Sequence, residues 1–502
     1  MKAKKFCIIA LVLAIVLLIA PISESRAEEK PEVKKSGDYE YYILNDGTAC
    51  IKRYYGIDEE VIVPEKLDGI RVTDIGDEAF YGWENLTKIT IPDSVENIGV
   101  NPFNGCENLL NINISANNPT LAFIDNALIY KPEKKMVSYL SASKESKYEI
   151  PYGIESIGDC AFYGCSNLTE ITIPDSVKSI GDSAFSRCKN LEKINIPNNV
   201  EKIDGNPFVG CGNLLNINIS ADHPTLAFMD NALFYKPEKK IISYLSASEE
   251  SKYEIPDGIK SIGDWAFTDC KNLTEITIPD SVQLIGNMAF SVCTNLTEIK
   301  IPDSVQSIGN SAFSFCRNLT EITIPDSVQS IGYRAFNYCK NLTEITIPDS
   351  VEKIGDNPFS GCENLLNINI SADHPTLTFI DNALIYKPEK RLVSYFCASK
   401  ESKYEIPDGI ASIGDSAFDG CSNLTEIKIP DGLQSIGELA FNGCKNMKKI
   451  NIPASVNSIE KYAFDGCDNI KITVARDSYA EKYCKENNIK YILEDSLDWL
   501  KN

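Results

Sequence analysis

Seventeen cysteines and two histidines are the residues of this chain whose side chains offer the most chemistry. Thiolate and imidazole groups together could hold zinc or form a nucleophile and its base. The two histidines, His223 and His374, lie in separate repeats, and no Cys-x-x-Cys pair is present. The spacing therefore argues against a zinc site and against catalysis by a cysteine and a histidine.

Most of the cysteines share one position of a repeated sequence, next to an Ala-Phe pair. A small residue that recurs once per repeat is expected to be buried, and neighbouring thiols that point the same way are badly placed for disulfides. We therefore predict buried free thiols at these twelve positions. The pairing of Cys50, Cys160, Cys397 and Cys484, which lie outside the register, is left open. The twelve are Cys106, Cys165, Cys188, Cys211, Cys270, Cys293, Cys316, Cys339, Cys362, Cys421, Cys444 and Cys467.

The remaining motifs also argue against an enzyme. No Gly-x-Ser-x-Gly, Walker loop, His-Glu-x-x-His or dinucleotide fingerprint is present. His223 and His374 occupy equivalent positions in two copies of one segment, and Asn118 takes that position in a third copy. The aspartate of Ile-Gly-Asp becomes Asn287 and Asn310 in two repeats, which disfavours a calcium ladder. We predict no catalytic residue, no metal site and no cofactor.

A 23-residue repeat dominates the sequence. Its consensus is Ile-Pro-Asp-Ser-Val-x-x-Ile-Gly-x-x-Ala-Phe-x-x-Cys-x-Asn-Leu-Thr-Glu-Ile, with copies starting at Ile278, Ile301 and Ile324. A fixed period of this length indicates stacked coils of a solenoid that share one continuous core. Alternation around Ile171 and Ile173 predicts a strand in each coil, which Pro174 ends. The predicted fold is a β-rich solenoid with one parallel sheet.

Three longer segments interrupt the repeat. Each contains two apolar runs, such as residues 128–130 and 136–139, separated by Lys-Pro-Glu-Lys. This pattern predicts a β-hairpin that packs on a flank of the rod. The predicted organisation is a signal peptide at 1–27, a linker and β cap at 28–88, the solenoid at 89–474 with inserts at 115–150, 220–255 and 371–406, and a C-terminal cap at 475–502.

The first residues have the pattern of a secretory signal peptide. Basic Lys2, Lys4 and Lys5 precede an apolar run at 8–19, and Ser25-Arg26-Ala27 has the spacing of a cleavage site. No further apolar stretch follows, so no transmembrane segment is expected after removal of the signal. The net charge of −22 disfavours nucleic acid as a partner. The chain is expected to be secreted or at the cell surface.

The repeat consensus and its hairpin inserts resemble the BspA-like leucine-rich repeat family. The Asp-Gly-Thr entry at 46–48 and the Ser-Tyr-Ala-Glu-Lys-Tyr exit at 478–483 are also similar to that family. The resemblance implies a secreted or surface leucine-rich repeat protein that mediates adhesion to host matrix or other cell-surface proteins. The alternative is a glycan-binding or envelope-scaffold protein with no specific protein ligand. The sequence does not predict the oligomeric state.

A stack of acidic side chains is expected on the outer face of the central strands. Glu275, Glu298, Glu321 and Glu344 occupy the same position in four successive coils, and side chains of like charge on neighbouring strands repel one another. The stack could be an acidic groove for a basic protein segment or a cation. It could equally be a solvated face that keeps the sheet from aggregating.

A second candidate surface breaks the repeat pattern. Two residues after the buried phenylalanine, eight coils carry glycine, whereas three central coils carry larger side chains. Apolar and aromatic residues beside an arginine have the composition of a protein-binding hot spot. The alternative is that these side chains fold down over the rod. The candidate partner-binding residues are Trp265, Met288, Val292, Phe315, Tyr333, Arg334 and Tyr338.

Overall fold

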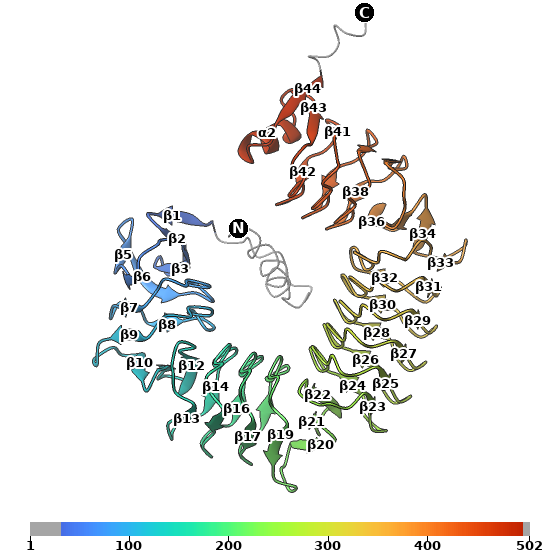
Figure 1. The fold of residues 1–502 in the computed structure, drawn as a ribbon. Helices are drawn as coiled ribbons and strands as arrows, with labels where there is room; N and C mark the ends of the chain where they lie inside the picture. Colours follow the sequence, from blue (N-terminus) through green and yellow to red (C-terminus); the bar gives the residue numbers. More distant parts are fainter. Residues whose placement is uncertain (1–31, 495–502) are drawn as a thin grey trace, which may run out of the picture.

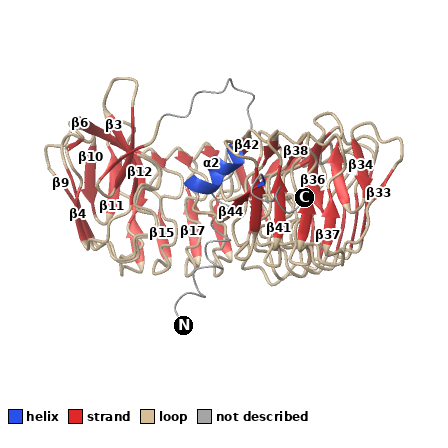
Figure 2. Ribbon diagram, turned by 90° about the horizontal axis from the view of Figure 1, so that it is seen from above, coloured by secondary structure: helices blue, strands red, loops and turns tan. Residues whose placement is uncertain are grey.

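The structure is a computed structural model that describes residues 32–494. The predicted signal peptide at 1–27 and the end of the predicted C-terminal cap lie outside the described residues. The coils stack along an open ring, with the two caps at its ends (Figure 1). Viewed from above, the strands of successive coils stand side by side around this ring (Figure 2). The predicted β-rich solenoid is confirmed.

One strand of each coil joins a parallel ladder on one side of the solenoid, and within residues 32–494 this ladder is divided into five separate sheets. In β25 (Glu275–Thr277), Ile276 is buried while its two neighbours are exposed, as the alternation of a strand requires. Ile276 pairs in register with Ile299 of β27 (Glu298–Lys300). The other strands of this main ladder are β4 (Glu60–Ile62), β7 (Lys88–Ile91), β9 (Asn111–Ile114), β13 (Lys147–Glu149), β15 (Glu170–Thr172), β17 (Lys193–Ile196), β19 (Asn216–Ile219), β23 (Lys252–Glu254), β29 (Glu321–Thr323), β31 (Glu344–Ile347), β33 (Asn369–Ile370), β37 (Lys403–Glu405), β39 (Glu426–Lys428), β41 (Lys449–Ile452) and β43 (Lys471–Val474).

A second parallel ladder follows the Val-x-x-Ile turn, so the prediction of one parallel sheet was incomplete. In β16 (Ser179–Ile180), Ile180 is buried and pairs with Ile157 and Ile203 of the neighbouring coils. Strands of two residues are too short to show alternation in the sequence, which is why they were missed. The other strands of this second ladder are β6 (Ile70–Ile75), β8 (Asn97–Ile98), β14 (Ser156–Ile157), β18 (Lys202–Ile203), β24 (Ser261–Ile262), β26 (Leu284–Ile285), β28 (Ser307–Ile308), β30 (Ser330–Ile331), β32 (Lys353–Ile354), β38 (Ser412–Ile413), β40 (Ser435–Ile436) and β42 (Ser458–Ile459).

Each insert forms a meander of three antiparallel strands. In the first insert, β10 (Leu121–Ile124) pairs with β11 (Ala127–Tyr130), and β11 pairs with β12 (Lys135–Tyr139). The predicted hairpin is β11–β12, but it does not pack on a flank, because β12 continues the second ladder by pairing in parallel with β14. The corresponding strands are β20 (Leu226–Met229), β21 (Ala232–Tyr235) and β22 (Lys240–Tyr244) in the second insert, and β34 (Leu377–Ile380), β35 (Ala383–Tyr386) and β36 (Arg391–Tyr395) in the third.

The meanders divide the interior, so the expectation of one continuous core was wrong. Leu128 and Val137 pack into the core that precedes the first insert. Ile129 and Met136, on the opposite face of the same strands, pack into the core that follows it. A strand buried on both faces reads as an unbroken apolar run, as in these inserts. The buried residues accordingly form four separate clusters.

A buried asparagine joins the coils on either side of each insert. In these coils Asn-Pro-Phe replaces the usual x-Ala-Phe, at Asn101, Asn206 and Asn357. The Asn101 side-chain amide donates to the carbonyl of Cys160 at 2.7 Å, and that of Asn206 donates to the carbonyl of Trp265 at 2.9 Å. Each bond spans 59 residues, so these junction asparagines hold the stack together where the insert interrupts it.

Both ends of the described solenoid are capped. At the start, β1 (Lys34–Ser36), β2 (Tyr39–Ile43) and β3 (Ala49–Tyr54) are antiparallel, and β3 then pairs in parallel with β6. The short β5 (Lys66–Leu67) pairs with β6 as well. At the end, α2 (Tyr479–Glu486) buries Ala480 and Cys484, and β44 (Tyr491–Leu493) extends the main ladder. No helix within residues 32–494 combines the length and apolar character needed to span a bilayer.

We call the contact between the coils before and after an insert a junction. We predict that Asn206→Ala destabilises the junction at the second insert. The Trp265 carbonyl would lose its donor in a partly buried setting, which costs about 1–3 kcal/mol in free energy of unfolding. Urea unfolding followed by tryptophan fluorescence measures this loss. The matched control is Asn190→Ala, because the exposed Asn190 makes the same kind of bond to Ser166 where water can replace it. Equal effects of the two substitutions would contradict a special role for the junction.

Candidate functional site

The two histidines have a structural role in the inserts. Nδ1 of His223 accepts the backbone N–H groups of Thr225 and Leu226 at 3.3 and 3.1 Å, and Nε2 donates to the carbonyl of Pro197 at 3.1 Å. The side chain is almost fully buried. His374 makes the same set of bonds, and burial lowers the pKa of both imidazoles. Neither ring is placed to act on a substrate.

In the first insert, Asn118 occupies the position that the histidines occupy in the other two inserts. Its side-chain oxygen accepts the N–H groups of Thr120 and Leu121 at 3.0 and 2.8 Å in the first insert. An amide oxygen and a neutral imidazole nitrogen are both acceptors, so either residue can hold the turn. Within residues 32–494 no cluster of three or more His, Cys, Asp or Glu side chains is arranged to hold a metal ion.

The cysteine ladder consists of buried thiols that bond to the preceding coil. The Cys293 thiol donates to the carbonyl of Phe267, and the Cys316 thiol to that of Phe290, each at 3.1 Å. Burial raises the pKa of the Cys316 thiol to about 12. Eleven of the twelve ladder cysteines are free, which confirms the prediction for those positions. A protonated, buried thiol is a poor nucleophile.

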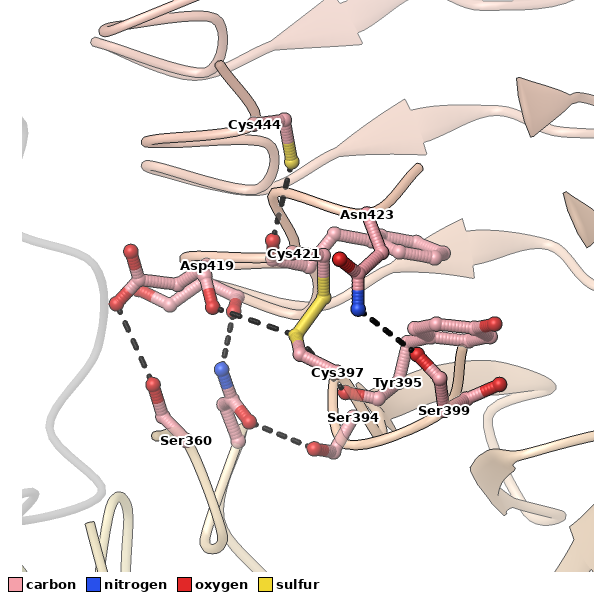
Figure 3. The surroundings of a disulfide bond; sticks show 12 residues. Ser360, Ser394, Tyr395, Cys397, Ser399, Asp419, Cys421, Asn423 and Cys444 are labelled. Carbon is pink, nitrogen blue, oxygen red and sulfur yellow. Dashed lines mark hydrogen bonds between the residues drawn. A yellow bond between two sulfur atoms is a disulfide. The ribbon is translucent and has the colours of Figure 1, made fainter. Parts of the chain in front are cut away.

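Cys421 is the exception, because it forms a disulfide with Cys397 of the third insert (Figure 3). The prediction of a free thiol at Cys421 was therefore wrong. Ladder thiols do point the same way, but Cys397 approaches from the neighbouring insert, with a Cα–Cα distance of 4.8 Å. The other two inserts carry Ser141 and Ser246 at this position. Cys50, Cys160 and Cys484 are free.

The acidic stack lies on the main ladder as expected. Glu275 pairs in register with Glu298, and Glu321 with Glu344. Lys252 forms an ion pair with Glu275 at 2.5 Å, and the Glu344 carboxylate accepts a hydrogen bond from Asn369. The carboxylates of Glu298 and Glu321 have no ion-pair partner among the described residues.

The outer coils neutralise the same position. Glu170 lies between Lys147 and Lys193, at 2.8 and 3.6 Å from their ammonium groups. Glu426 lies in the same way between Lys403 and Lys449, at 3.0 and 3.5 Å. At this one position of the main ladder, glutamates without an ion-pair partner among residues 32–494 are therefore a feature of the central coils, not of the repeat as such.

Three of the seven predicted hot-spot residues occupy one unusual backbone position. Val292, Phe315 and Tyr338 have φ values of 61°, 61° and 55°, in the left-handed region where the equivalent residues of eight coils are glycine. The rings of Phe315 and Tyr338 stack with centroids 4.8 Å apart and planes 9° apart. The Arg317 guanidinium lies 5.7 Å from the Phe315 ring centre. We call the side chains of Phe315, Arg317 and Tyr338 the aromatic ridge.

Val292 has no ring and is not part of the aromatic ridge, and the other four predicted residues lie elsewhere. Met288 is buried in the stack, and the Trp265 carbonyl belongs to the second junction. Tyr333 and Arg334 reach across the third insert. The Arg334 guanidinium pairs with the Asp419 carboxylate at 3.1 Å, with only 13% of its side chain exposed.

Arg317 is the ridge residue that sequence reasoning missed. The equivalent position after the ladder cysteine is basic in several coils, as in Lys189 and Lys340, so its charge did not stand out. The only signal was its place two residues after Phe315. Burial raises the pKa of Tyr338, so its phenol stays neutral at physiological pH. The ridge is thus a half-buried apolar pair with one cation at its edge.

We predict that Cys397→Ser removes about 3 kcal/mol from the free energy of unfolding, as a disulfide closing a loop of this length does. The Cys421 thiol would then donate to the Tyr395 carbonyl, as Cys165 does to Tyr139. Thermal unfolding with and without a thiol reductant measures the effect. The reductant should lower the midpoint of the natural protein and leave that of the variant unchanged. A variant that responds equally to the reductant would contradict the assignment.

We predict that the histidines make stability fall in mild acid. Their folded-state pKa lies below the unfolded value of 6.5, so their contribution is present above that pH and is lost as the pH falls through the folded-state pKa. Denaturant midpoints at about pH 7 and about pH 5 measure the loss. The control is His223→Asn/His374→Asn, which copies the Asn118 turn of the first insert and should lose less stability over this interval. Equal losses would contradict the prediction.

Comparisons with known proteins agree with this architecture. The family model described as a BspA type leucine rich repeat region matches residues 61–131, 137–250, 241–366 and 393–492. A leucine rich cell surface protein from Faecalibacterium prausnitzii A2-165 is 31% identical, with 69% of this chain and 97% of that chain covered and a TM-score of 0.47. A search of curated proteins gives no match.

Two further solved structures are more distant. A leucine-rich repeat protein from Bacteroides ovatus is 23% identical, with 93% of this chain and 100% of that chain covered and a TM-score of 0.33. The pneumococcal vaccine antigen PcpA is 18% identical, with coverages of 92% and 99% and a TM-score of 0.38. Because the family model spans more than half of the sequence, this chain belongs to the BspA-type leucine-rich repeat family.

Proposed function

We propose that this chain is an exported, non-enzymatic surface protein that binds a protein ligand through its central coils, with host matrix or other cell-surface proteins as the class of partner. The signal-peptide pattern at 1–27 supports export, as does a disulfide, which persists in oxidising compartments. The similarity to a cell surface protein of F. prausnitzii supports the same location.

The aromatic ridge is the observation that carries this proposal. A non-glycine residue in the left-handed region costs of order 1–3 kcal/mol, and such strain concentrates at functional sites. Eight other coils avoid that cost with glycine. Phe315 and Tyr338 incur it and remain only partly buried, with the two rings stacked on each other and the Tyr338 ring against Gly361. Aromatic pairs flanked by arginine are typical anchors of protein interfaces.

The acidic stack supports a partner with basic segments. Glu298 and Glu321 repel their neighbours, whereas the outer coils relieve the same repulsion with lysines. A basic partner would supply the missing charge and speed association at low ionic strength. The structural roles of the histidines and the raised pKa of buried ladder thiols such as Cys316 support a binding function over catalysis.

We predict that Phe315→Gly/Tyr338→Gly weakens binding of the protein ligand by at least about tenfold while the protein stays folded. Relief of backbone strain offsets the lost ring stacking, each of order 1 kcal/mol, so the free energy of unfolding should change by about 1 kcal/mol or less. Surface-binding assays against matrix and cell-surface proteins measure the first effect. Urea unfolding measures the second.

Val292→Gly is the matched control, because it changes the same backbone position without removing a ridge ring. It should leave binding unchanged. Protein binding that the double variant retains in full would contradict the ridge as the site. Binding to glycans alone would favour the glycan-binding or envelope-scaffold alternative over a protein ligand.

A further inference from the structure

A hollow of about 340 Å³ lies at the first junction, where the coils before and after the first insert meet. Glu107 comes from the coil before the insert and Ser141 from the insert itself. Tyr163 and Arg187 come from the two coils after it, and Lys189 follows Arg187. Its volume is at the small end of the range for ligand pockets, about 300–1,000 Å³.

Missing side chains keep this hollow open. Gly164 lines it with a φ of 73°, and a Cβ atom added there would have no neighbour within 4 Å. Gly105, at the equivalent position of the coil before the insert, lines it as well. Arg187 occupies the same position one coil further on and closes one side.

Two cations without ion-pair partners border the hollow. The Arg187 guanidinium lies over the Tyr163 ring, 5.3 Å from its centre, which fixes it while leaving its N–H groups without a carboxylate acceptor among the described residues. Lys189 is exposed and likewise has no carboxylate partner in residues 32–494. Both cations are therefore available to an anionic group in the hollow.

The second junction contains a carboxylate of its own in this place. Asp269 takes the position of Gly164, with a φ of 67°, and pairs with Lys271 at 2.6 Å. Val292 takes the position of Arg187. The second junction therefore contains a carboxylate and a cation that pair with each other, whereas the two cations of the first junction have no carboxylate partner among the described residues.

The third junction is closed by other means. Asp419 takes the position of Tyr163, and its carboxylate pairs with Arg334 from an earlier coil. Cys397, at the position of Ser141, is tied into the disulfide (Figure 3). The third junction keeps an open glycine at Gly420 and a lysine at Lys445, but Gly443 replaces Arg187 there. Of the three copies of this junction, the first alone combines an open glycine position with an arginine beside it.

We propose that the hollow at the first junction binds an acidic sugar residue. Arg187 and Lys189 hold its carboxylate, with the guanidinium fork presenting two N–H groups to the two oxygens. The Ser141 hydroxyl, which has no hydrogen-bond partner among the described residues, and the Glu107 carboxylate bind the ring hydroxyls. This site is separate from the aromatic ridge, so the inference goes beyond the proposed function.

Calorimetric titration of the intact protein with D-glucuronate, D-glucose and glutarate tests the proposal. Saturable binding of glucuronate is expected, at least about tenfold tighter than that of glucose, which lacks the carboxylate, and of glutarate, which lacks the ring. Added salt should weaken it, because the cations lie at the surface. Glutarate binding as tight as glucuronate would overturn the sugar in favour of an acidic peptide side chain. The absence of saturable glucuronate binding would overturn the site.

Two variants taken from the second junction locate the binding. Arg187→Val removes the main cation, and Gly164→Asp places a carboxylate in the hollow at a backbone angle that Asp269 already adopts. Each should weaken glucuronate binding by at least about tenfold, and because the second junction folds with these residues, the stack should remain intact. Phe315→Gly/Tyr338→Gly should leave it unchanged. Glucuronate binding retained by both junction variants would overturn the assignment to this hollow.

Discussion

The close approach of each coil to the next is the constraint on which the rest of the structure depends. The rings of Phe267 and Phe290 stack with centroids 5.1 Å apart, and the next pairs along the central coils are similar. At Gly309 the approach is closer still, because an added Cβ would lie 2.5 Å from the backbone of Gly286. The Ile-Gly and Ala-Phe positions of the repeat follow directly from this contact.

The same constraint explains the polar positions of the repeat. Buried backbone groups at the turns need partners, and each coil takes them from its neighbour. The Cys316 thiol satisfies a carbonyl of the previous coil, and the Asn287 side chain accepts the N–H of Asn310 in the next coil. Asp264 does the same for Asn287, so aspartate and asparagine interchange here because only the acceptor oxygen matters. The variation that argued against calcium is thus a consequence of backbone bonding.

The period and composition of the repeat were enough to predict the solenoid, the inserts and the buried thiols. The second ladder was not predictable, because strands such as β16 contain one buried residue each. The disulfide was not predictable either, because it depends on an insert meeting a coil 24 residues away. For the candidate site, the break in the glycine pattern drew attention to Phe315 and Tyr338, whose rings stack in the structure. That Tyr333 and Arg334 serve the third junction depends on contacts 82 to 85 residues away, which no local pattern encodes.

Near-identical repeats carry a risk of misalignment, since a coil can stack on the wrong neighbour with almost the same contacts. The three meanders limit this risk, because each must sit between two cores and be spanned by its own junction asparagine. A slip of one coil would leave that buried amide and the carbonyl beyond the insert without partners. The three junctions also differ in their chemistry, and this distinguishes copies that are otherwise alike. The first has an open cationic hollow, the second an Asp269–Lys271 ion pair, and the third a disulfide. The inserts thus act as register marks that let a repetitive chain find a single alignment.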